Sequence, residues 1–125
     1  MKKFITLTAL AEGLTGIALI IMPNVVVSFL LGKPTYGPEG KITAMLAGGA
    51  ILALAVICWI LRNLADLHKL VQGMLLYNCV IITIAVYAFL GYHITNIGLW
   101  FMILVHTILT VWGAITLWAK PVSNV

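Results

Sequence analysis

The chain has 125 residues, of which 63% are hydrophobic and only 8% are charged. A soluble domain usually has about a quarter of its residues charged, so seven basic and three acidic side chains cannot supply a water-facing surface. This composition indicates a protein surrounded mostly by lipid, and the length leaves no room for a separate soluble catalytic domain. The net charge of +4 does not indicate nucleic-acid binding, because the basic residues flank apolar runs, where they orient membrane segments.

Four apolar runs are each long enough to cross a bilayer as an α-helix. They cover approximately residues 4–22, 41–61, 70–90 and 97–118. The first run follows a basic start, as in a signal peptide, but Glu12 interrupts its apolar core and the chain begins at Met1, so we expect a retained span. The sequence therefore predicts one all-α domain over residues 1–125, an integral membrane antiparallel four-helix bundle.

A proline ends the first run. Pro23 is disfavoured inside a helix and favoured in the first turn of a new one, so residues 23–31 are predicted to form a short interfacial helix at the membrane surface. The alternative, a single helix of roughly 30 residues, would need a strong tilt. Glycine and proline then predict a loop over residues 32–40, and polar residues predict turns at 62–69 and 91–96.

The basic residues predict the orientation of the spans. With four spans, both termini and the turn at 62–69 lie on one side, which holds five basic residues against two on the other. The five are Lys2, Lys3, Arg62, Lys69 and Lys120, and the two are Lys33 and Lys41. The positive-inside rule then places both termini in the cytoplasm.

Three polar residues fall within the spans, where burial in hydrocarbon costs free energy. Glu12, Asn78 and His106 come from three different spans and lie roughly 13 to 18 Å from the cytoplasmic side, given the helical rise. Tyr77 points elsewhere on its helix but could reach the edge of this group. The shared depth fits either a structural polar core that fixes helix packing, or a ligand- or proton-handling site, or an interface with another protein.

Signatures of catalysis and of metal or cofactor binding are missing from the sequence. It contains no nucleophile triad, HExxH motif or phosphate loop, and Glu12 with His106 would give a metal too few ligands. His68 and His93 lie in turns at opposite ends, which disfavours an intrachain haem. Cys58 and Cys79 lie at different depths, so we expect two buried thiols rather than a disulfide.

The stretch AEGLTGIALIIMPNVVVSFLLG, followed by a polar glycine–proline loop and a small-residue span ending in CWI, resembles a group of small bacterial four-span proteins. The group lies in the neighbourhood of the DoxX-like four-helix membrane proteins. The matching positions are Glu12, Gly16, Pro23, Gly32, Gly48, Trp59, Tyr77, Asn78 and His106. An arginine expected early in the second span is replaced by the Thr43–Ala44 region, which changes the charge balance if that arginine normally partners the glutamate. The resemblance implies the four-span topology and a bacterial inner membrane, and it implies no particular activity.

Two hypotheses of function come from different classes. The first is a non-enzymatic accessory or structural subunit that oligomerises or joins a larger membrane complex, because the loops are minimal and small residues suit helix contacts. The alternative is a binder or transporter component for a small apolar or lipid-like ligand, in a pocket lined by Glu12, Asn78 and His106. A third hypothesis, an intramembrane enzyme, would use His106 and Glu12 as an acid–base pair. We expect no cofactor or metal in any of these.

Overall fold

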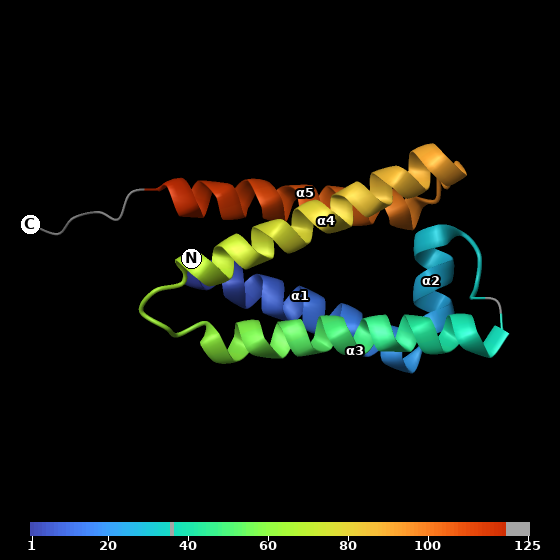
Figure 1. Ribbon diagram of the computed structural model, residues 1–125, viewed down its shortest axis with the longest axis horizontal. Helices are drawn as coiled ribbons and strands as arrows, with labels where there is room; N and C mark the ends of the chain where they lie inside the picture. Colours follow the sequence, from blue (N-terminus) through green and yellow to red (C-terminus); the bar gives the residue numbers. More distant parts are fainter. Residues whose placement is uncertain (36, 120–125) are drawn as a thin grey trace, which may run out of the picture.

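The computed structural model describes residues 1–35 and 37–119. Those residues form five α-helices and no strand (Figure 1). The helices are α1 (Lys2–Ile21), α2 (Pro23–Leu31), α3 (Gly37–Leu61), α4 (His68–Tyr92) and α5 (Ile97–Trp118). All but α2 are long and apolar enough to cross a membrane. The prediction of an all-α helical bundle is therefore confirmed, and the helices fit a multi-pass membrane protein.

The four long helices form two antiparallel pairs. α1 packs along α3, and α4 packs along α5, whereas contact between the two pairs is much less extensive. Figure 1 shows α2 lying across one end of the molecule, nearly perpendicular to the long helices, so that it bridges from one pair to the other. It contacts α1, α3 and α5. This bridge closes the end of the space between the pairs.

Local backbone geometry separates α2 from α1. Met22 leaves the helical region (φ −134°, ψ 57°), and Pro23 follows in the first turn of α2, where its missing N–H group costs nothing. Gly32 ends α2 in the left-handed conformation (φ 78°), and its N–H group donates to the Ser28 carbonyl oxygen at 2.8 Å. Glycine carries no Cβ penalty in that conformation. The first apolar run is thus one spanning helix followed by a separate short one.

The loop predicted over residues 32–40 is too long. α3 begins at Gly37, so that Pro38 and Glu39 lie in its first turn. Proline is well suited to that position, and an acidic side chain there interacts favourably with the positive end of the helix dipole. α4 likewise begins at His68 and ends at Tyr92, about one half-turn beyond the predicted span at each end.

Two glycines bring α1 and α3 into backbone contact. A Cβ placed on Gly16 would lie 2.8 Å from the Gly48 carbonyl oxygen, and a Cβ on Gly48 would lie 2.8 Å from the Gly16 carbonyl oxygen. Small residues allow such close approach between membrane helices, where packing rather than the hydrophobic effect drives association. Glu12 lies one turn before Gly16 on α1, so this close crossing also fixes the orientation of the α1 face that carries Glu12.

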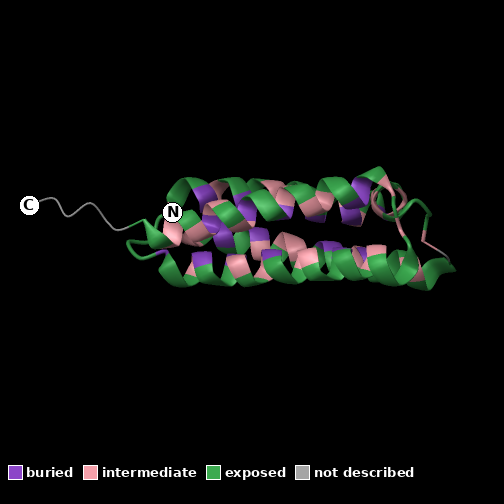
Figure 2. Cartoon of the chain, turned by 90° about the horizontal axis from the view of Figure 1, so that it is seen from above, coloured by how far each residue is buried: buried purple, intermediate pink, exposed green. Residues whose placement is uncertain are grey.

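The two pairs are joined by a core near the chain's N-terminus. Figure 2 shows buried residues along the inner faces of the long helices, several of them near that end. The cluster consists of Phe4, Ile5, Ala9, Cys58, Leu67, Val71, Met74 and Leu109. The Phe4 ring meets Trp112 of α5 edge to face, with ring centroids 5.7 Å apart. The pairs are therefore packed together at one end and bridged by α2 at the other.

Candidate functional site

Glu12 lies on the face of α1 that looks toward α4 and α5, and its side chain is 5% exposed. Its Oε2 atom accepts a hydrogen bond of 2.9 Å from the Tyr77 hydroxyl group of α4. Within residues 1–35 and 37–119, the only ion-pair contact is between Asp66 and His68. Glu12 therefore has no basic side chain within 4.0 Å in that part of the chain, although an unpaired buried carboxylate is costly.

Asn78 and His106 form a second buried contact beside the first. His106 Nδ1 lies 2.7 Å from Asn78 Oδ1, and the Asn78 amide nitrogen donates to the Met74 carbonyl oxygen at 2.6 Å. Because the Asn78 nitrogen is already committed to Met74, its oxygen must be the acceptor and His106 Nδ1 must carry the hydrogen. This arrangement directs the other ring nitrogen of His106, Nε2, away from Asn78.

The structure brings the three predicted polar residues to one region, where they form two separate contacts. The partner of Glu12 is Tyr77, and neither His106 nor Asn78 bonds to the carboxyl group. Successive residues on a helix point about 100° apart, so Tyr77 faces α1 while Asn78 faces α5. Tyr77 and His106 meet edge to face with ring centroids 5.9 Å apart, which joins the two contacts.

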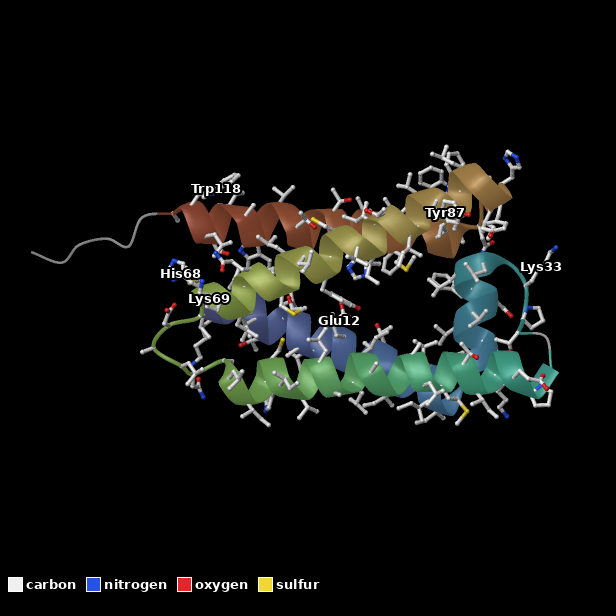
Figure 3. All side chains as sticks on the ribbon, viewed as in Figure 1. Glu12, Lys33, His68, Lys69, Tyr87 and Trp118 are labelled. Carbon is white, nitrogen blue, oxygen red and sulfur yellow. The ribbon has the colours of Figure 1, made fainter. Side chains whose placement is uncertain are left out.

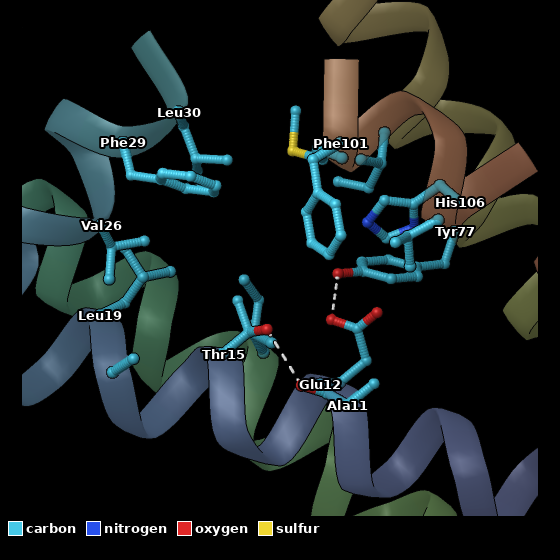
Figure 4. A pocket seen from close by; sticks show the side chains of 15 residues that line it. Ala11, Glu12, Thr15, Leu19, Val26, Phe29, Leu30, Tyr77, Phe101 and His106 are labelled. Atoms are coloured by element: carbon cyan, nitrogen blue, oxygen red, sulfur yellow. Dashed lines mark hydrogen bonds between the residues drawn. The ribbon is translucent and has the colours of Figure 1, made fainter. Parts of the chain in front are cut away.

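A cavity of about 260 Å³ opens beside these residues, on the side toward α2 (Figure 4). Its lining comes from all five helices. The lining residues are Ala11, Glu12, Thr15, Ala18, Leu19, Val26, Phe29, Leu30, Ile51, Tyr77, Ile81, Phe101, Met102, Val105 and His106. Polar groups are few: Glu12, Tyr77 and His106 lie together, Thr15 is the other polar residue, and the rest of the wall is apolar. Asn78 lies behind His106 and does not line the cavity.

The α2 wall of the cavity is held in place by α5. The Asn96 amide nitrogen donates to the carbonyl oxygens of Ser28, at 3.4 Å, and of Phe29. Gly98 lies against the Phe29 carbonyl group so closely that a Cβ there would collide with it. The sequence gives no direct signal that Val26, Phe29 and Leu30 line a site, because an apolar interfacial helix is equally compatible with contact to lipid alone.

Thr8 is a further polar residue inside the packed end of the molecule. It lies one turn before Glu12, is fully buried, and its hydroxyl oxygen has no hydrogen-bond partner among the residues that the structure describes. A threonine hydroxyl is small enough to be accommodated in a helix interface between membrane spans. The polar face of α1 therefore extends from Thr8 to Thr15.

The remaining titratable residues lie outside the cavity. Asp66 Oδ1 accepts hydrogen bonds from the backbone N–H of His68 at 2.8 Å and from its ring at 3.0 Å. These two contacts, the backbone bond first, lower the pKa of the Asp66 carboxyl group.

Cys58 is buried against the Met74 sulfur at 3.5 Å, and Cys79 is an exposed free thiol. The exposure of Cys79 corrects the expectation of two buried thiols. No group of three His, Cys, Asp or Glu residues in the described ranges could hold a metal ion.

Searches against protein-family models, curated proteins and solved structures return no match to this sequence. The resemblance to DoxX-like proteins therefore stays a prediction from the residues quoted for it.

Proposed function

We propose that the protein binds a small amphipathic ligand in the cavity between its two helix pairs, within the membrane. The observation that carries this proposal is the clustering of Glu12, Tyr77 and His106 in a mostly apolar cavity. Ligand sites commonly combine apolar walls with a few polar groups that fix orientation. A ligand whose polar head lies at Glu12 and whose apolar body lies along Phe29 and Phe101 would match both the polar group and the apolar wall of the cavity.

The packing contrast within the bundle supports binding over a purely structural role. A structural polar core would be expected to lie in close-packed surroundings, since protein interiors are packed as densely as organic crystals. The helix pairs are packed in this way around Phe4 and Met74, both almost completely buried. The Glu12 carboxyl group instead lines the cavity.

A pair of matched substitutions tests this proposal. Ala18 lines the cavity, whereas Ala53 is exposed on α3. In native mass spectrometry of protein released directly from membranes, we expect a bound small molecule on the wild type and on Ala53→Phe, but not on Ala18→Phe. A wild type that carries no bound mass, or an Ala18→Phe variant that retains it, would contradict binding in this cavity.

A second candidate function is that of a subunit in an oligomer or larger membrane complex. Gly49 of α3 and Gly73 of α4 have no heavy atom within 4 Å of an added Cβ. Exposed glycines permit close contact with another membrane helix. Static light scattering in mild detergent, with the detergent mass subtracted, should then give more than one copy per particle; a monomer without co-purifying partners would exclude this role.

We propose that the protein belongs among the DoxX-like four-span proteins of the bacterial inner membrane, with both termini in the cytoplasm and α2 at the outer surface. Figure 3 shows Lys69 and Lys33 at opposite ends of the helices, as a four-span topology requires, and Lys120 lies outside the described residues. Arg62 also stacks over the Trp59 ring at 3.6 Å, a contact suited to an interface.

Orientation is testable by labelling in intact cells. In a background without native cysteines, Lys33→Cys should react with a membrane-impermeant maleimide, whereas Asn63→Cys should react only after the cells are permeabilised. The reverse pattern would place the termini outside.

A further inference from the structure

With Glu12 ionised and His106 neutral, the polar side chains that line the cavity have no uncommitted hydrogen-bond donor. The Tyr77 hydroxyl group donates to Glu12, and the Thr15 hydroxyl group donates to the Ala11 carbonyl oxygen at 3.0 Å (Figure 4). His106 uses its Nδ1 hydrogen for Asn78. In a neutral imidazole with hydrogen on Nδ1, Nε2 is an acceptor. The cavity therefore offers acceptors: the second carboxyl oxygen of Glu12 and Nε2 of His106.

The Glu12 carboxyl group also determines which charge a ligand can carry. Only its Oε2 atom has a hydrogen-bond partner, and no basic side chain of the described chain lies within 4.0 Å of it. A charged donor forms a stronger hydrogen bond to a carboxylate than a neutral donor does, particularly away from water. An anionic ligand, by contrast, would meet the carboxyl group without finding a free donor.

Aromatic rings add a second feature that favours a cation. Phe29 and Phe101 both line the cavity, with ring centroids 6.3 Å apart in an edge-to-face arrangement. Figure 4 shows Phe101 next to Tyr77 and above Glu12, with Phe29 approaching from α2. The faces of aromatic rings attract cations, and more strongly where water is excluded.

We propose that the ligand of this cavity is a protonated amine attached to a small apolar group. The ammonium group donates to Glu12 and to His106 Nε2, and the apolar part lies against Phe29, Phe101 and Ile81. The inference rests on the proposed function and names its ligand class. It predicts discrimination by charge rather than by shape, since an alcohol of the same shape has one donor and no charge.

The test uses three aromatic probes of similar size with full-length protein in lipid nanodiscs, after subtraction of binding to empty nanodiscs. Phenethylamine is cationic at neutral pH, phenethyl alcohol is neutral, and phenylacetate is anionic. We expect phenethylamine to bind at least about tenfold more tightly than phenethyl alcohol, and phenylacetate not to bind, because a hydrogen bond from a charged donor is stronger than one from a neutral donor. Glu12→Gln should lose about tenfold or more of the amine affinity, whereas Glu39→Gln, on the exposed start of α3, should keep it.

The outcomes separate this inference from the proposed function. Equal binding of the alcohol and the amine, or an unchanged amine affinity in a folded Glu12→Gln variant, would overturn the choice of an amine but leave a ligand cavity, provided that Ala18→Phe abolishes binding. Failure of phenethylamine to bind the wild type would overturn the choice of an amine, whereas the proposed function is overturned only if the wild type also carries no bound mass in native mass spectrometry. If Glu12→Gln does not fold, as judged by circular dichroism, the preference among the probes and its loss in Ala18→Phe decide the question.

Discussion

At the scale of single residues, adjacent positions on α4 make contacts with different helices. Tyr77 bonds to Glu12 of α1, and Asn78 bonds to His106 of α5. Together they link the two helix pairs through polar contacts at the boundary between the packed core and the cavity. Interhelical hydrogen bonds in membranes are individually weak, about 0.6 kcal/mol on average. Here each contact also leaves a buried polar partner behind if it is broken, which raises its cost.

Tyr77→Phe should therefore destabilise the protein more than an average loss of a membrane hydrogen bond. We expect the free energy of unfolding to fall by about 1–2 kcal/mol, because the Glu12 carboxyl group loses its donor while it stays buried. The measurement is reversible unfolding in mixed micelles. Tyr87→Phe is the matched control, because Tyr87 lies on the same helix and is 61% exposed. Equal effects at the two positions would show that the bond to Glu12 contributes nothing.

At the scale of elements, the close crossing of α1 and α3 depends on glycine at Gly48 but not at the adjacent Gly49. A Cβ on Gly48 would lie 2.7 Å from the Leu19 Cβ, whereas nothing lies within 4 Å of a Cβ on Gly49. We expect Gly48→Ala to lower the free energy of unfolding by about 1–3 kcal/mol through overpacking. Gly49→Ala should be neutral or stabilising by up to about 1 kcal/mol, since alanine favours a helix. Unfolding titrations of the two variants check the opposite signs; a tolerated Gly48→Ala would contradict the backbone contact.

The position of α2 depends on Asn96. Asn96→Ala removes the donor to the carbonyl groups of Ser28 and Phe29, which should cost about 0.5–1.5 kcal/mol per bond. The loss should appear locally, as faster hydrogen–deuterium exchange across residues 23–31, with exchange in α1 and α3 unchanged. Asn63→Ala, in the exposed turn at the opposite end, serves as the control. Unchanged exchange in α2 would mean that contacts other than Asn96 hold this wall of the cavity.

The elements show which parts of the structure follow from sequence alone. Length and hydropathy predict the four long helices, and the conformational limits of Pro23 predict the break before α2. The start of α3 is missed, because glycine and proline around Pro38 are equally typical of loops and of helix starts. The shared depth of Glu12 and His106 predicts that they lie at a similar level of the bundle. It cannot give the rotation of each helix, so the pairing of Tyr77 with Glu12 and the contribution of α2 require the structure.

At the scale of the whole molecule, the bundle combines a packed end with a cavity end, and the two differ in how they respond to lost side-chain volume. In lipid, truncation of a side chain loses packing contacts. It loses little or no hydrophobic transfer energy, because lipid is as apolar as the side chain. The cost of a substitution then depends mainly on the empty volume it leaves. Truncation of a residue that joins the helix pairs should consequently lower the free energy of unfolding more than truncation of an equally large residue beside the cavity.

Phe4→Ala and Phe101→Ala test this difference between the two ends. Phe4 is fully buried between the pairs, whereas Phe101 lines the cavity and is 58% exposed. We expect Phe4→Ala to lower the free energy of unfolding by about 2–4 kcal/mol, somewhat less than in a water-soluble core, and Phe101→Ala to lower it by less than about 1 kcal/mol. Steric-trapping measurements in bicelles give both values. Equal losses would mean that the cavity end is as closely packed as the core, which would also remove the physical basis for placing a ligand there.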